Sequence, residues 1–249
     1  MGGLIGAALA ALLLVFAAGA AHAGQVQVAV AANFTEPAKV IAAAFAAKTG
    51  DQAVLSFGAS GQFYVQISHG APFEVLLSAD ADRPKRAEQE GLGVAGTRFT
   101  YAIGQLVLWS KTPGLVDPAG TVLAKGDFKS LSIADPTAAP YGQAAVETLT
   151  TLGLYQQLTP RIVKGGSITQ AYQFVQTGAA ELGFVALSQV VSDPSGSRWL
   201  VPAADHAPIE QQAILLTVGA RNPAAQAFLA FLKSPEGVAI IRRYGYEVP

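Results

Sequence analysis

The 249-residue sequence contains no cysteine, only three histidines and few charged residues, 13% of the total. The absence of cysteine excludes disulfides and thiolate metal sites, so stability must come from the packed core. Sixteen lysines and arginines face 17 aspartates and glutamates, which leaves a formal net charge of −1. This balance offers no basic stripe for nucleic acid and no acidic tail. The composition therefore predicts a globular protein that does not bind nucleic acid.

The first residues form an uncharged apolar run, Leu4 to Ala20, which ends in Ala21-His22-Ala23 before Gly24. A short apolar stretch followed by a small-x-small pattern is typical of a cleaved export signal, and the stretch is short for a membrane span. We therefore predict a signal peptide over residues 1–23.

Two short uncharged loops carry the strongest local signal for function, residues 31–35 (AANFT) and 57–61 (FGASG). Each stands between a β-branched strand pattern and a helix pattern. A helix start presents unpaired N–H groups and the positive end of the helix dipole, and both favour anions. Asn33 and Ser60 add small side-chain donors, and neither loop holds a lysine, arginine or histidine. The loops indicate a desolvated oxyanion held by neutral donors; ordinary turn and cap roles for Asn33 and Ser60 are the alternative.

Strand and helix patterns alternate along the chain, which predicts an α/β protein with mostly parallel sheets. The expected strands cover residues 26–30, 53–56, 73–78, 132–134, 161–163 and 182–187. The expected helices begin at Thr35 as N-cap, after the Ser60 loop, at residues 81 and 141, at Ser167, and at residues 223 and 235. Ser167 and Gln170 form the S-x-x-Q pattern of a capping box.

Two long β-rich segments, residues 97–110 and 211–218, interrupt this alternation. We interpret them as two antiparallel strands that cross between two α/β lobes, near residues 100–108 and 209–217. Lobe one is predicted to hold residues 24–103 plus 212–249, and lobe two residues 104–211, with a ligand cleft between them.

The two-lobe arrangement predicts where the helix starts meet. Those at Asn33 and Ser60 in lobe one would face those at Tyr141 and Ile168 in lobe two across the cleft. Four such starts could surround a dianion with backbone N–H groups and no counter-charge.

Enzyme signatures are incomplete in this sequence. Residues 91–96 match G-x-G-x-x-G, but they follow a helix pattern and precede a strand, the reverse of a dinucleotide site. Gln62 stands where a hydrolase elbow around Ser60 needs glycine. Outside the signal only His69 and His206 could serve as a base, and both lie beside predicted surface turns. A secreted serine hydrolase is therefore the enzyme alternative to a binding protein.

Several blocks of the chain together resemble a known family. The blocks are AANFTEPAKVIAAAF (31–45), SFGASGQFYVQISHGAPFEVLLSAD (56–80), RFTYAIGQLVLWSK (98–111), APYGQAAVETL (139–149), LGFVALSQV (182–190) and AIIRRYGYEVP (239–249). From about Gln25 to Pro249, the chain resembles the periplasmic molybdate-binding proteins of ABC importers, a branch of the type II periplasmic binding protein fold.

This resemblance implies a periplasmic binding protein, not an enzyme, that holds molybdate or tungstate between its lobes and needs no cofactor. Molybdenum would be bound through its oxo groups and not as a bare cation. The partners implied are the inner-membrane permease and ATPase of an ABC importer, and we expect a monomer.

The resemblance also implies the binding residues. Asn33 and Ser60 match side-chain donors, Ala32 and Ile168 match backbone N–H donors, and Tyr141 matches a contact at the start of a lobe-two helix. Many relatives have serine at the position of Asn33 and tyrosine at that of Ala186, so this chain resembles the branch that uses asparagine and the Tyr141 loop.

A cavity that contains only donors selects among oxyanions. Hydrogen phosphate carries an O–H donor, which would find no acceptor in such a cavity. Because burying an unpaired donor is costly, hydrogen phosphate would be strongly rejected. Sulfate would be excluded only by size. A binder for sulfate or another oxyanion is therefore the alternative within the binding class.

Overall fold

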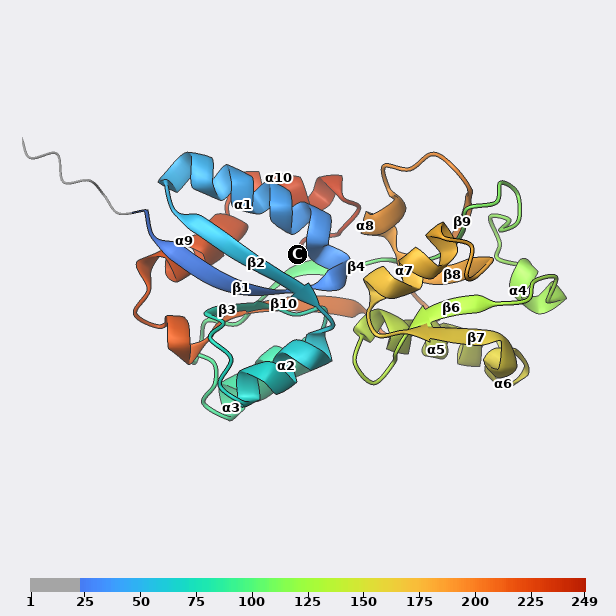
Figure 1. Ribbon diagram of the computed structural model, residues 1–249, viewed down its shortest axis with the longest axis horizontal. Coiled ribbons are helices and arrows are strands. Elements are labelled where there is room, and N and C mark those ends of the chain that lie inside the picture. Colours follow the sequence, from blue (N-terminus) through green and yellow to red (C-terminus); the bar gives the residue numbers. More distant parts are fainter. Residues whose placement is uncertain (1–22) are drawn as a thin grey trace, which may run out of the picture.

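The computed structural model describes residues 23–249, which form two α/β lobes lying side by side (Figure 1). Each lobe is built on a five-stranded sheet, with the order β2-β1-β3-β10-β4 in lobe one and β7-β6-β8-β5-β9 in lobe two. The predicted two-lobe α/β architecture is therefore observed. The predicted signal peptide lies outside the described residues, apart from Ala23.

Lobe one contains both ends of the described chain. Its strands are β1 (Gln25–Ala31), β2 (Gln52–Gly58), β3 (Val75–Leu77), β4 (Phe99–Gly104) and β10 (Ile209–Leu215). Its helices are η1 (Ala32–Phe34), α1 (Thr35–Thr49), α2 (Ser60–Ser68), α3 (Asp82–Gln89), η3 (Thr217–Gly219), α9 (Pro223–Leu232) and α10 (Pro235–Arg243). Helices α1, α9 and α10 cover one face of the sheet, and α2 and α3 cover the other (Figure 1).

Lobe two repeats this layering. Its strands are β5 (Leu106–Ser110), β6 (Leu131–Ala134), β7 (Ile162–Gly165), β8 (Leu182–Ala186) and β9 (Ser197–Leu200). Its helices are α4 (Val122–Lys125), α5 (Pro140–Thr151), α6 (Tyr155–Leu158), η2 (Thr159–Arg161), α7 (Ile168–Gln176) and α8 (Leu187–Val190). Helices α7 and α8 lie on one side of the sheet and α5 and α6 on the other (Figure 1).

The sheets are mostly parallel, as predicted. β1 pairs in parallel with β2 and β3, and β6 pairs in parallel with β7 and β8. One strand in each sheet runs against its neighbours: β10 lies antiparallel to β3 and β4, and β5 lies antiparallel to β8 and β9. These reversed strands are the ones that follow a crossing between lobes.

The crossings differ in detail from the expected ones. The β-rich segment 97–110 is divided at Gln105, because β4 belongs to the first sheet and β5 to the second. The return crossing is the segment 201–208, and β10 joins the first sheet from Ile209 onward. Sheet pairing therefore departs from the expected lobe boundaries by one residue at the first crossing and by three at the second.

Each lobe has its own apolar core. In lobe one, Phe45 of α1 packs edge-on against Phe228 of α9, with ring centroids 5.4 Å apart. In lobe two, Trp109 of β5 packs against Tyr172 of α7 at 5.3 Å. The largest apolar cluster of lobe two extends into lobe one, since Ala32 and Ala59 belong to the same buried group as Tyr141 and Ile168.

No single helix within residues 23–249 is both long and apolar enough to span a membrane. The bent pair α9 and α10 meets that test of length and composition only when its two helices are taken together.

Candidate functional site

One small cavity lies where the two lobes meet, and all five predicted binding residues line it. The lining residues are Ala31, Ala32, Asn33, Gly58, Ala59, Ser60, Ala79, Ala139, Pro140, Tyr141 and Ile168. Its volume, about 10 Å³ for the centre of a water-sized sphere, is far below the several hundred Å³ of pockets for organic ligands. Among the described residues, no charged side chain lines it. In this structure the space has room for about one water molecule, and the groups around it are neutral, so a larger guest would need its walls to move apart.

In lobe one the chain enters the cavity at the carboxyl ends of β1 and β2. Strand β1 runs directly into η1 and then α1, and β2 leads through Ala59 into α2. Thr35 does not cap its helix as predicted, because η1 already forms the first turn; its Oγ1 donates to the Ala32 carbonyl at 2.8 Å. The helical start therefore falls on Ala32 and Asn33.

In lobe two, α5 leaves one N–H free in its first turn. Pro140 has no N–H, while the N–H groups of Gly142 and Gln143 both donate to the Ala139 carbonyl. The N–H of Tyr141 has no such partner and lies at the cavity wall. The local sequence therefore leaves one backbone donor of this turn, on a residue that lines the cavity, without a partner in the helix.

The start of α7 is capped as the sequence predicts, with one difference. Ser167 Oγ accepts from the N–H of Gln170 at 3.3 Å, which completes half of the capping box. Gln170 Oε1 accepts from the N–H of Gly166 at 2.6 Å and not from that of Ser167. The cap thus satisfies the N–H groups of Gln170 and Gly166, whereas the N–H of Ile168, a residue that lines the cavity, takes no part in it.

Ser60 presents a hydroxyl donor to the cavity. It is the first residue of α2 and not its cap, and it is 1% exposed. Its Oγ accepts from the N–H of Ala79 at 2.9 Å, so one lone pair is occupied by the protein. The hydroxyl proton is therefore available to an acceptor in the cavity.

The side-chain amide of Asn33 is turned toward the protein. Its Nδ2 donates to Gln211 Oε1 at 2.8 Å and to Tyr246 Oη at 2.9 Å, which uses both protons. The Asn33 carbonyl accepts from Ser188 Oγ and Tyr246 Oη. In this orientation the Asn33 side chain donates no hydrogen bond to the cavity. Asn33 therefore lines the cavity as predicted, but its side chain is not oriented as the predicted donor.

Three tyrosines are buried at the cavity: Tyr141 lines it, and Tyr101 and Tyr246 lie behind it. Burial raises the pKa of Tyr101 and Tyr141 well above the ordinary value, and it raises that of Tyr246 to about 12. All three hydroxyls therefore keep their protons at neutral pH. Together with Gln211 and Ser188 they form an uncharged network that crosses from lobe one to lobe two.

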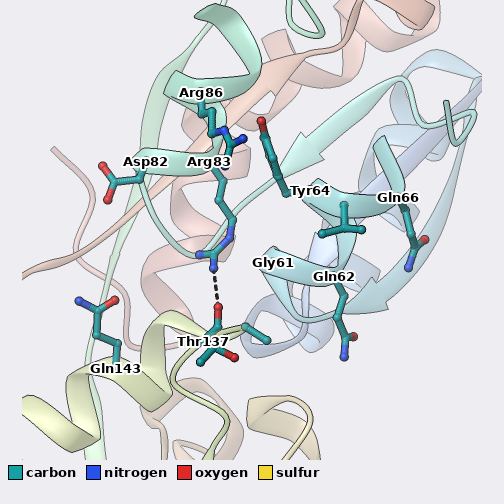
Figure 2. Close-up of a pocket in the computed structure, with 11 residues that line it drawn as sticks. Gly61, Gln62, Tyr64, Gln66, Asp82, Arg83, Arg86, Thr137 and Gln143 are labelled. Atoms are coloured by element: carbon teal, nitrogen blue, oxygen red, sulfur yellow. Dashed lines mark hydrogen bonds between the residues drawn. The ribbon is translucent and has the colours of Figure 1, made fainter. Parts of the chain in front are cut away.

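Hydrogen bonds between the lobes close the cavity. The N–H of Gly61 donates to the Ala138 carbonyl at 2.9 Å, and Thr169 Oγ1 donates to the Ala32 carbonyl at 3.2 Å. Arg83 Nη2 reaches the Thr137 carbonyl at 3.1 Å, drawn as a dashed line in Figure 2. The structure is therefore that of the closed form.

Three charged groups near the boundary between lobes line an outer groove of about 730 Å³. Arg83, Arg86 and Asp82 extend from α3 along this groove (Figure 2). Asp80 precedes α3, and its Oδ1 accepts from the N–H of Arg83 in the first turn at 2.8 Å. None of these charged side chains lines the small cavity.

Within the described residues, the side chains that a serine hydrolase or a dinucleotide site would need do not lie together. His69 and His206 bond to the carbonyls of Val65 and Ala207, and neither lines the cavity with Ser60. Residues 91–96 lie between α3 and β4, the wrong context for a dinucleotide. No group of three or more metal-ligating side chains exists within residues 23–249.

Four residues behind the cavity carry no motif that identifies them from sequence: Tyr101, Ser188, Gln211 and Tyr246. One signal is present, since Gln211 and Gln212 stand directly before the apolar run AILL in a predicted strand, and a buried glutamine needs partners.

Comparison with known proteins agrees with this geometry. Residues 26–247 match the family described as bacterial extracellular solute-binding protein. Over 241 residues the chain is 56% identical to the molybdate-binding protein ModA of Rhodobacter capsulatus, covering 97% of this chain and 95% of that protein. It is also 56% identical over 230 residues to ModA of Azotobacter vinelandii, covering 91% of each.

Among solved structures, the periplasmic molybdate-binding protein of Azotobacter vinelandii superposes with a TM-score of 0.88 at 44% identity, covering 90% of this chain and 99% of that one. This match confirms the type II periplasmic binding protein fold. The chain therefore belongs to the bacterial extracellular solute-binding proteins and, among them, to the ModA family of molybdate-binding proteins.

Proposed function

We propose that this protein captures molybdate, and also tungstate, between its lobes and delivers it to an ABC importer. One observation carries the proposal: the cavity is small, closed, and lined by helix starts from both lobes without a charged side chain. The names of its relatives point to the same ligand.

The proposed donors are the backbone N–H groups of Ala32, Tyr141 and Ile168 and the hydroxyl of Ser60, with Asn33 as a further donor. A hydrogen bond to a charged group contributes about 1.5–3 kcal/mol, so these five donors would supply roughly 10 kcal/mol. Because these values are net of the hydrogen bonds lost to water, they act against the lost translational and rotational freedom of the ion and can leave tight binding.

The absence of acceptors would set the selectivity. A fully deprotonated tetrahedral dianion uses every donor, whereas hydrogen phosphate places an O–H against N–H groups. We propose that sulfate is rejected through its smaller size alone.

Titration calorimetry with molybdate, tungstate, sulfate and phosphate tests this proposal. We expect molybdate and tungstate to bind at least 100-fold more tightly than sulfate, and phosphate to give no heat of binding. Equal affinity for sulfate would instead make the protein a general oxyanion binder. No binding of any of the four would contradict the proposal.

Location and partners follow from the same role. We propose that residues 1–23 direct export to the periplasm, and that the mature protein acts as a monomer. Its partners would be the permease and ATPase of a molybdate importer. Chemical analysis of protein purified from the periplasm should find molybdenum in it, and mass measurement should find a chain beginning at residue 24.

A further inference from the structure

Gln211 occupies an unusual position for a primary amide. It is fully buried on β10, at an irregularity between Gln211 and Gln212 where the pairing with β4 shifts register. Such a bulge re-aims a side chain that a regular strand would point elsewhere. A carboxamide placed this deep must satisfy its polar atoms within the protein.

Its partners come from both lobes. Gln211 Oε1 accepts from Asn33 Nδ2 at 2.8 Å and from Tyr101 Oη at 3.1 Å, while Nε2 donates to Tyr141 Oη at 3.3 Å. Asn33 and Tyr141 are both predicted binding residues, one in each lobe. Gln211 therefore contacts the two halves of the site, although it does not line the cavity itself.

The backbone leaves room for this arrangement. A Cβ on Gly104 would lie 2.2 Å from Tyr141 Oη and 2.7 Å from Gln211 Nε2. Only glycine at the end of β4 permits the phenol and the amide to meet. The contact is thus built into the strand that leads to the first crossing.

The two amides must face each other in complementary directions. With Gln211 presenting its oxygen, Asn33 presents Nδ2 to it, and both Nδ2 protons stay within the protein. If both amides turn by half a rotation, Asn33 Oδ1 accepts from Gln211 Nε2 and from the Tyr246 hydroxyl. Asn33 Nδ2 then turns away from this network and becomes available to an anion.

We propose that Gln211 is a positioning residue that sets the direction of the Asn33 amide, so that Asn33 can donate to the oxyanion when the ion binds between the closed lobes. This inference rests on the proposed function. Gln211 can match either direction because a primary amide both donates and accepts. A side chain that only accepts would hold Asn33 Nδ2 away from the ligand.

A double-mutant cycle tests whether Gln211 acts through Asn33. The variants are Gln211→Met, Asn33→Ala and their combination, with Gln212→Met as the matched control. Gln212 lies on the same strand and is 6% exposed, but its amide bonds Arg98, Thr100 and Glu210. The readouts are the Kd for molybdate by calorimetry and the Tm of each variant.

We expect Gln211→Met to weaken binding about 10-fold and Asn33→Ala about 30-fold, with the combination within about threefold of Asn33→Ala alone. Gln212→Met should bind within about twofold of the unsubstituted protein. If the two losses multiply, or if Gln211→Met leaves the Kd unchanged, the proposal is overturned. Binding by the unsubstituted protein is measured first, so that a failure of the proposed function is separate from a failure of this inference.

Gln211→Glu supplies a second test that keeps the size of the side chain. When protonated, the introduced carboxyl can donate and accept as the amide does; when ionised, it only accepts. The titratable groups around it are Tyr101 from β4, Tyr141 from α5 and Tyr246 from the C-terminal segment, which keep their protons between pH 6.0 and 8.5.

The affinity of this variant should approach that of the unsubstituted protein at pH 6.0 and fall at least 30-fold by pH 8.5, because burial raises the pKa of a carboxyl. Gln212→Glu should show no such fall. Repeating the series in the Asn33→Ala background separates positioning from charge repulsion. A fall of equal size in that background, or a pH-independent affinity, would overturn the proposal.

Discussion

At the scale of single residues, Ser60 combines two roles that its type alone does not reveal. Its oxygen accepts from the N–H of Ala79, and this bond leaves its proton free for the cavity. Alanine at this position would remove a donor and leave a buried N–H without its acceptor.

Ser60→Ala should therefore weaken molybdate binding by about 1–3 kcal/mol, a factor of roughly 5 to 150 in Kd. Ser68→Ala is the control, since Ser68 lies at the exposed end of the same helix and bonds the Val65 carbonyl. Calorimetry measures both variants. An unchanged Kd for Ser60→Ala would remove this hydroxyl from the site.

Asn33 shows how the structure modifies an expectation drawn from sequence. On the sequence alone, Asn33→Ala is expected to weaken molybdate binding without lowering the stability of the fold. In the structure, however, the Asn33 amide is also the partner of buried Gln211 and Tyr246. Asn33→Ala should thus also lower the free energy of unfolding by about 1–3 kcal/mol, measured by urea denaturation. Unchanged stability would mean that the buried partners find other bonds.

At the scale of helices and strands, the helix starts could be predicted because their signals are local. Pro140 before Tyr141 and the Ser167–Gln170 pair determine the first turns of α5 and α7 without help from the rest of the chain. The 3₁₀ turn before α1 was missed, because Ala32 and Asn33 have no preference for it. The division of residues 97–110 at Gln105 was also missed, since both halves have the same β pattern and only long-range pairing separates them.

Gly61 lies in the first turn of α2, where the start of this helix contacts lobe two and so affects closure of the two lobes. A Cβ there would lie 3.0 Å from the Ala138 carbonyl, which belongs to lobe two, and 3.0 Å from Arg83 Nη2 of its own lobe. Opening of the lobes would move Ala138 away and relieve the first of these contacts.

Gly61→Ala should weaken binding about 10-fold by hindering closure, with little change in the Tm of the unliganded protein. Small-angle scattering should show a smaller ligand-induced compaction than in the unsubstituted protein. Gln66→Ala, on the exposed face of the same helix, is the control. Normal compaction together with normal affinity would show that the lobes tolerate the methyl group.

At the scale of the whole molecule, the uncharged network of Tyr101, Tyr141 and Tyr246 links the lobes. It could not be predicted from sequence, since its members are separated by up to 145 residues and carry no shared motif. The two lobes and the cavity between them could be predicted, because alternating patterns and chain order determine which strand ends meet.

The network predicts how stability depends on pH. Burial raises the pKa of Tyr246 from 10 to about 12, so folding favours its protonated form. The stabilisation is present in full below pH 10 and is lost as the pH rises from 10 toward 12. Between pH 9 and 11.5, the unsubstituted protein should lose more free energy of unfolding than Tyr246→Phe, by about 1–2 kcal/mol. Urea denaturation across this range measures it, and equal losses in the two proteins would exclude Tyr246 as the cause.

The central claim is that neutral groups from both lobes hold the ion without a salt partner. A crystal structure with molybdate, using the anomalous signal of molybdenum, tests it most directly. We predict one molybdenum peak between Asn33, Ser60, Tyr141 and Ile168, with every ligand oxygen within hydrogen-bond distance of an uncharged donor. A peak in the outer groove beside Arg83 and Arg86, or a lysine or arginine in contact with the ion, would contradict the account.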